Sequence, residues 1–167
     1  MAFSVTCPSY MLDKPILQAL TSTGVEDPVH EPGLLVTATD GRIFQYGCFD
    51  SSSVAAVAGA PAVTARTTAD NTVVFTADVS DGALHGIGCF LSVLTDTYYG
   101  WIQRAGFVKD VPITDGANGD VSAGDAIGAT TDSLWTKVTV GGTTSTSGIA
   151  PENSSSGVGN IFLSGCL

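Results

Sequence analysis

Two histidines, His30 and His85, are the side chains of this chain best suited to acid–base chemistry near neutral pH. A histidine that activates a serine also needs a carboxylate beside it, and such a triad is defined by geometry rather than by sequence order. Serine and aspartate are frequent throughout the chain, so a chance pairing around either histidine has little weight. The G-x-S-x-G sequence of a nucleophile elbow is absent. We therefore expect that the protein is not an enzyme, and a hydrolase with a hidden Ser/Asp/His site is the weakest alternative.

Four aspartates at intervals of five, Asp110, Asp115, Asp120 and Asp125, superficially suggest a calcium loop. An EF-hand loop needs alternating oxygen ligands and a closing acid at fixed offsets, and that order fails here. Three of them, Asp115, Asp120 and Asp125, stand beside glycine or threonine, where aspartate favours turns. We expect no metal and no cofactor, and a looser calcium site within residues 110–125 stays open as an alternative.

The four cysteines, Cys7, Cys48, Cys89 and Cys166, are far apart in the sequence. None belongs to a C-x-x-C pair or has a histidine at ligand spacing, so a zinc site is not expected. Free thiols in a reducing compartment are the expected state.

The stretch YYGWIQRAGF at residues 98–107 is the densest aromatic segment of the chain. On a strand, alternation would place Tyr99, Trp101, Gln103 and Ala105 on one face, and Tyr98, Gly100, Ile102 and Arg104 on the other. A stacking platform for sugars or bases needs several aromatic rings on one exposed face. A glycine beside a tryptophan is instead typical of a strand that another group approaches closely. We therefore interpret Tyr99 and Trp101 as a structural keystone, with a ligand platform from Tyr98 to Trp101 as the alternative.

The charge pattern argues against two classes of partner. The net charge is −10, and the six basic residues are scattered singly along the 167-residue chain. Nucleic acids and anionic membrane surfaces are bound by clustered lysine and arginine, so neither is an expected partner. No apolar run is long enough to span a bilayer, and the N-terminus lacks the pattern of a signal peptide.

The elements that must position these residues are predicted to be strands. Asp40-Gly41 between the β-prone runs 34–39 and 42–49 predicts a hairpin with a type I′ turn. Residues 62–67 and 72–79 predict a second hairpin, and residues 85–94 predict a buried strand, with a short helix as the competing assignment. Similar runs recur to the C-terminus, separated by glycine, aspartate or asparagine. The predicted fold is all-β, a compact β-barrel or β-sandwich over residues 34–167.

Residues 1–33 differ from this body. Pro28 and Pro32 exclude a regular helix or a central strand there, and a short helical piece is expected around Ile16 and Leu17. The segment has too many apolar residues for a purely solvated tail: Phe3, Val5, Tyr10, Met11, Leu12, Ile16 and Leu17. We expect an extended arm that lies on another surface.

Three short motifs stand out in the predicted body: YGWIQ at 99–103, VSAGDAI at 121–127 and DGRIF at 40–44. Together they resemble a pattern of small virion proteins of tailed phages. In that family a GW(I/V)Q strand precedes a V-x-x-G-D-x-(I/L) turn and strand, a D-G-R-x-(F/Y) hairpin comes earlier, and a further strand ends the chain. Here 149–150 or 159–164 would be that last strand, so the resemblance covers roughly residues 34–165.

The resemblance implies a capsid decoration (cement) protein, a homotrimer on the outer capsid surface of the virion, assembled in the host cytoplasm. It implies the major capsid protein as the partner, with an arm that runs across neighbouring subunits. The apolar arm residues named above are then the expected capsid contacts. The alternative is a head fibre, or a receptor- or glycan-binding module that uses the aromatic cluster from Tyr98 to Trp101.

Overall fold

The computed structural model describes residues 4–6, 24, 26–51, 54–67, 73–79, 87–114, 121–138 and 146–165. Within these ranges the chain is all-β, as predicted, and contains no helix. Eleven strands form one sheet. They are β1 (Ser4–Thr6), β2 (Leu35–Thr37), β3 (Ile43–Phe49), β4 (Pro61–Thr67), β5 (Val73–Thr76), β6 (Ile87–Phe90), β7 (Tyr99–Pro112), β8 (Ala126–Thr131), β9 (Leu134–Lys137), β10 (Gly148–Ile149) and β11 (Val158–Ser164).

Five of these strands are paired in a circuit. The order β3-β5-β4-β6-β7 is closed by pairing of β7 with β3, while the sheet as a whole is not a closed barrel. Each strand of the circuit contributes one buried side chain to a common core: Phe49, Phe75, Ala62, Phe90 and Ile102. Alternation accounts for this, because every second side chain of each strand points to the same side of the sheet. We call this group the circuit core.

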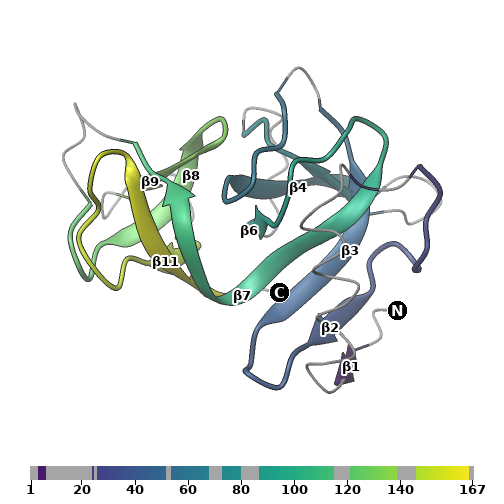
Figure 1. The fold of residues 1–167 in the computed structure, drawn as a ribbon, viewed down its shortest axis with the longest axis horizontal. Helices are drawn as coiled ribbons and strands as arrows, with labels where there is room; N and C mark the ends of the chain where they lie inside the picture. Colours follow the sequence, from purple (N-terminus) through teal and green to yellow (C-terminus); the bar gives the residue numbers. More distant parts are fainter. Residues whose placement is uncertain are drawn as a thin grey trace.

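Strand β7 is fourteen residues long and belongs to both halves of the molecule. Its first half pairs with β3 and β6 in the circuit, and its second half pairs with β11. Beyond the circuit, β8, β9, β10 and β11 pack over a second core around Trp135, Ile127 and Ile161. Figure 1 shows the two groups of strands joined by the long curved ribbon of β7.

The β2–β3 hairpin forms where it was predicted, but its turn type differs. The amide of Gly41 donates to the carbonyl of Ala38 at 3.0 Å, and the amide of Ala38 donates to the carbonyl of Arg42 at 2.8 Å. Gly41 has φ +86°, whereas Asp40 is not among the described residues with positive φ. A type I′ turn needs positive φ at both central positions, so that prediction was wrong. The pattern is instead a turn closed by one left-handed glycine.

The second predicted hairpin is also present, since β4 and β5 pair antiparallel. Within the segment 85–94, residues 87–90 form strand β6, and none of the described residues there is helical. Glycine is unfavourable inside a strand, yet β7 continues through Gly106 to Pro112.

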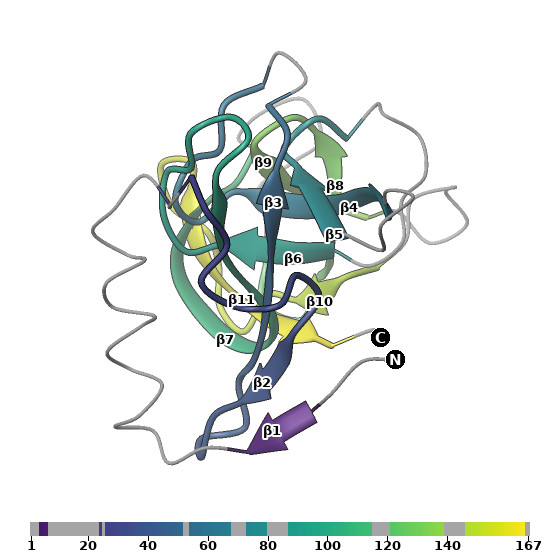
Figure 2. The same ribbon diagram turned by 90° about the vertical axis from the view of Figure 1, so that its right-hand side faces the viewer.

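The N-terminal segment meets the sheet at two places. β1 pairs in parallel with β2, with Val5 opposite Val36, and Figure 2 shows this pair projecting from the end of the molecule. Closer to the body, the amide of Gly33 donates to the carbonyl of Tyr46 at 2.7 Å. The helical piece expected around Ile16 and Leu17 lies outside the described residues.

Candidate functional site

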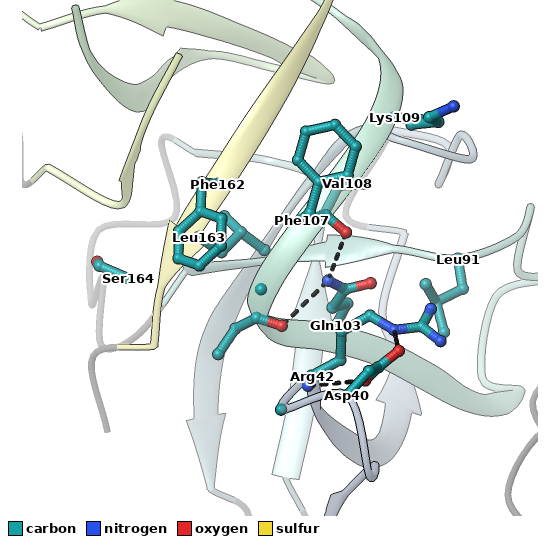
Figure 3. A pocket seen from close by; sticks show the side chains of 13 residues that line it. Asp40, Arg42, Leu91, Gln103, Phe107, Val108, Lys109, Phe162, Leu163 and Ser164 are labelled. Atoms are coloured by element: carbon teal, nitrogen blue, oxygen red, sulfur yellow. Dashed lines mark hydrogen bonds and ion pairs between the residues drawn. The ribbon is translucent and has the colours of Figure 1, made fainter. Parts of the chain in front are cut away.

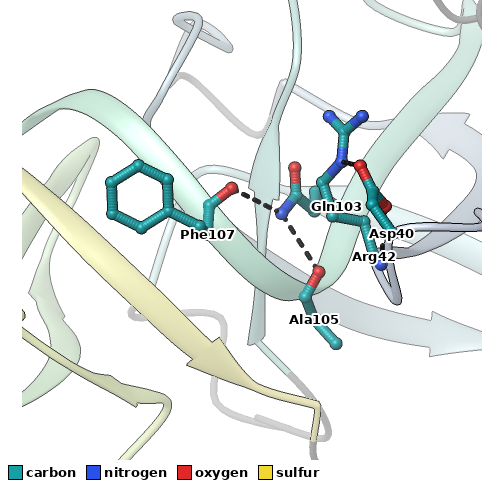
Figure 4. Close-up of polar contacts among 5 residues, drawn as sticks. All are labelled: Asp40, Arg42, Gln103, Ala105 and Phe107. Atoms are coloured by element: carbon teal, nitrogen blue, oxygen red, sulfur yellow. Dashed lines mark hydrogen bonds and ion pairs between the residues drawn. The ribbon is translucent and has the colours of Figure 1, made fainter.

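Strand β7 bends at Gly106, and the buried side chain of Gln103 forms hydrogen bonds to the backbone on both sides of the bend. Gly106 has φ +95°, and a Cβ there would lie 2.8 Å from the Cγ of Arg42. Nε2 of Gln103 donates to the carbonyls of Ala105 at 3.0 Å and of Phe107 at 3.1 Å, on either side of that glycine (Figure 4). Gln103 is only 2% exposed. It therefore supplies a side-chain donor to two backbone carbonyls at the bend.

A groove with a volume of about 770 Å³ lies on the outside of this bend. One wall is the β2–β3 turn with Asp40 and Arg42, and the other is formed by β7 and β11 with Phe107 and Phe162 (Figure 3). Leu91 lines it as well. The groove therefore lies at the surface between the β2–β3 turn and strands β7 and β11.

The polar wall of the groove is an ordered ion pair. Nε of Arg42 lies 2.7 Å from Oδ2 of Asp40, and the amide of Arg42 donates to Oδ1 at 3.0 Å. The guanidinium also lies 5.4 Å from the ring centre of Phe44, within the range of a cation–π contact. Partial desolvation would raise the pKa of Asp40, but the hydrogen bonds from Arg42 outweigh it and hold that pKa below its usual value. Both partners are half-exposed, so the pair orders the turn more than it stabilises the fold.

The other wall is apolar and open to solvent. Phe107 is 40% exposed and Phe162 is 53% exposed, and the two residues are paired directly across β7 and β11. Ile149 of β10 is paired with Phe162 on the other side and is 52% exposed. Because directly paired residues place their side chains on the same face, these three form one row across three strands. We call Phe107, Phe162 and Ile149 the apolar row.

The predicted keystone residues Tyr99 and Trp101 lie elsewhere on β7. Trp101 is 4% exposed and packs in a third cluster with Phe44, Tyr46 and Val36. The Trp101 ring centre lies 5.1 Å from that of Tyr46, and the Tyr99 ring stacks on Tyr46 at 6.1 Å. Burial raises the pKa of Tyr46, and it raises that of Tyr99 as well. We call Tyr46, Tyr99 and Trp101 the aromatic cluster.

The segment 26–33 covers this cluster. The imidazole of His30 lies 5.2 Å from the Tyr46 ring and 5.3 Å from the Trp101 ring, measured between ring centres. The amide of Val29 donates to the Tyr46 hydroxyl at 3.2 Å. A ligand platform would need an open Trp101 face, so this arrangement favours packing over ligand binding. On the opposite face of β7, a Cβ at Gly100 would fall 2.6 Å from Leu94, which explains the glycine by close side-chain approach.

His30 therefore lies among aromatic rings, and His85 lies outside the described residues. The structure shows no Ser–His–Asp arrangement in the part of the chain that it describes.

The aspartates of the suggested calcium loop do not converge where the structure describes them. Asp125 accepts a hydrogen bond from the amide of Ser122 at 2.8 Å and lies 2.9 Å from Nζ of Lys137. The hydrogen bond from Lys137 is the main reason that the pKa of Asp125 lies below its usual value. Asp110 is on β7, and Asp115 and Asp120 lie outside the described ranges. No cluster of three metal-binding side chains occurs among the residues that the structure places.

Two of the cysteines are described, and both are free thiols. Cys89 is buried in the second core, and burial raises its pKa far above the usual value. Cys48 is half-buried, and its pKa is raised by burial and by Asp50 and Asp96. Cys7 and Cys166 lie outside the described residues.

Of the arm residues expected to contact the capsid, the structure describes one, Val5. Val5 belongs to β1, whereas Phe3, Tyr10, Met11, Leu12, Ile16 and Leu17 lie outside the described residues. Among the residues that the structure describes, there is no helix of the length and apolar character that crossing a bilayer requires.

The residues of the apolar row were not identified from the sequence. Phe162 stands between the buried Ile161 and Leu163 in a continuous apolar run, so no alternation marked it as outward-facing. Its pairing with Phe107 brings together residues from distant parts of the chain.

The groove and the apolar row thus form the candidate site, a surface with the geometry of a contact region. Comparison of the chain with models of known protein families gave no match, and comparison with curated protein sequences gave none either.

Proposed function

We propose that this protein is a virion structural protein of a tailed phage that decorates the capsid. In this role it binds the outer surface of the head as a homotrimer and stabilises it by clamping neighbouring major capsid subunits. The proposal rests on the resemblance of the three motifs and on the placement of the N-terminal segment.

The observation that carries the proposal is the edge position of β1. β1 has one described neighbour, β2, and it ends the strand order of the sheet. An edge strand exposes backbone amides and carbonyls that accept a strand from another chain. An arm that ends in such a strand can join its own body to a neighbouring subunit. Contacts made by several copies at once become intramolecular after the first, which strengthens attachment without a large single interface.

The residues of the three motifs support a structural role. Asp40 of DGRIF pairs with Arg42, Gln103 of YGWIQ holds the bend of β7, and Asp125 of VSAGDAI orders a turn. Each motif therefore stiffens the body at a different point. A stiff body is what a cementing protein requires, because ordering a mobile partner costs binding free energy.

The test is co-sedimentation with empty heads assembled from the major capsid protein of the source phage. We expect saturable binding of the full chain and at least about tenfold weaker binding after deletion of residues 1–23. The deletion removes β1 but retains Glu26–Gly33, which cover Trp101. Circular dichroism and the melting temperature confirm that the deleted chain is folded.

The two possible failures are distinguishable. Unchanged binding by the deleted chain would show that the arm is not the clamp. Absence of binding by the full chain would overturn the capsid role itself. The glycan-binding alternative has less support, since Trp101 lies beneath residues 26–33 and is 4% exposed.

A further inference from the structure

The apolar row has the composition and register of a buried interface, although it faces solvent. Phe107, Phe162 and Ile149 are in register on adjacent strands, and Ala126 of β8 is paired with Ile149 at the end of the row. Adjacent strands lie about 4.8 Å apart, so four neighbouring strands present a continuous apolar line. On a sheet with one solvated face, polar residues are expected at such outward positions.

The inner face of the same strands is already filled. Ile161 and Leu163, the neighbours of Phe162, are 0% and 1% exposed within the second core. Val111 on β7 is also fully buried there. The outward phenylalanines are therefore not core residues displaced by a shifted register. They are additional apolar surface.

The size of the row suits the centre of a modest interface. A phenylalanine contributes about 150–250 Å² when fully buried, so the exposed fractions of these three side chains sum to roughly 300 Å². A specific interface buries about 800 Å² on each partner, with an apolar centre and a polar rim. The groove supplies that rim through Arg42, Asp40 and Lys109.

The charges around the row favour an acidic partner. The chain carries a net charge of −10 and has only six basic residues, yet two of them, Arg42 and Lys109, line the groove. The carboxylate that lines it, Asp40, is paired with Arg42, and Lys109 takes part in neither of the ion pairs found among the described residues. Asp110 lies three residues beyond Phe107 on β7. The charged side chains that line the groove therefore sum to +1, on a molecule whose net charge is −10.

We propose that the apolar row and the groove beside it are the surface through which one copy of this chain binds a second copy. Two molecules of net charge −10 repel each other over most of their surfaces. That repulsion is weakest where Lys109 and Arg42 lie beside apolar side chains. A second copy also supplies the excess of acidic residues that a basic rim complements. The inference rests on the homotrimer of the proposed function and assigns a surface to it. Because self-association is measured without a capsid, its failure is distinguishable from a failure of capsid binding.

The test is sedimentation equilibrium of the full chain at neutral pH, compared with the double variant Phe107→Thr/Phe162→Thr. Threonine keeps the strand preference and removes the rings. We expect the unmodified chain to form an oligomer and the double variant to dissociate with at least about a tenfold higher dissociation constant. The matched control is Val93→Thr, an apolar residue 52% exposed between β6 and β7, which should leave association unchanged.

Lys109→Glu tests the charge argument separately. It should weaken association at low salt, and the difference should shrink as added salt screens the charges. An unchanged far-ultraviolet circular dichroism spectrum and a single cooperative melting transition show that the variants are folded. A monomeric full chain, or association that the double variant leaves unchanged, would overturn the proposal. A monomer whose double variant loses capsid binding would overturn it too, and would assign the row to the capsid.

Discussion

The two aromatic groups of β7 have opposite surroundings although they belong to one strand. The aromatic cluster in the first half of the strand is covered by residues 26–33, and Trp101 there is 4% exposed. The apolar row in the second half has no described cover, and Phe162 is 53% exposed. Similar side chains are therefore used in two ways. A ring that the chain itself covers stabilises the fold, whereas a ring that it leaves open stabilises the fold little and is available to a partner.

The largest expected change in the free energy of unfolding is at the aromatic cluster, which residues 26–33 cover. Trp101→Ala should lower the free energy of unfolding by about 3–5 kcal/mol, because it removes a large buried side chain and leaves a cavity. Phe162→Thr is the counterpart at the open end and should cost less than about 1 kcal/mol. Urea denaturation of both variants measures the difference. Equal losses would mean that the two groups do not differ in their contribution to stability.

The next largest change in the free energy of unfolding is expected at Gln103, which lies on β7 between the aromatic cluster and the apolar row. Gln103→Leu should lower the free energy of unfolding by about 1–3 kcal/mol, since the carbonyls of Ala105 and Phe107 lose their donor. Gln103→Glu is the matched variant, because it keeps the shape and replaces the donating amide with a group that repels those carbonyls. Both variants should be destabilised in thermal denaturation. A neutral Gln103→Leu would show that the bend is held by other contacts.

The smallest effect concerns the polar wall of the groove and depends on pH. The pKa of Asp40 is lower in the folded protein than its usual value near 3.8, so its carboxylate favours the folded state above that pH. This contribution is fully present above about pH 4 and is lost as the pH falls through the lowered pKa. Asp40→Asn should therefore reduce the melting temperature slightly at pH 7 and by less at pH 3. A difference that grows on acidification would contradict the sign of the pKa shift.

The fold class and the division of YYGWIQRAGF between two faces follow from local patterns. Alternation predicts that Trp101 and Ile102 point to opposite sides, and they lie in different clusters of the structure. The Asp40-Gly41 pair likewise marks a reversal of the chain. Its turn type is not predictable from that pair alone, because the backbone angle of Asp40 depends on how Ala38 and Arg42 bond across the turn.

The candidate site depends on contacts that have no local signal. The groove forms only when β11 pairs with β7 and the Asp40–Arg42 turn lies beside them. The parallel pairing of β3 with β5, which contributes to the circuit, likewise joins strands that are not linked by a hairpin. The length of β7 has no local signal either, because glycine weakens a strand, and only the structure shows that Gly106 is a bend inside one strand.

The shared strand β7 also determines how the protein reaches its fold. Strand β3 is synthesised well before its partner β7, and the pairing of Cys48 with Tyr99 closes the circuit across about fifty residues of chain. Until then β3 and β6 have unpaired edges, which are sites of misassembly in a crowded cell. The second core also requires β7, so neither half is complete without it. We expect slow, all-or-none folding in which the arrival of β7 is the rate-determining event for both halves.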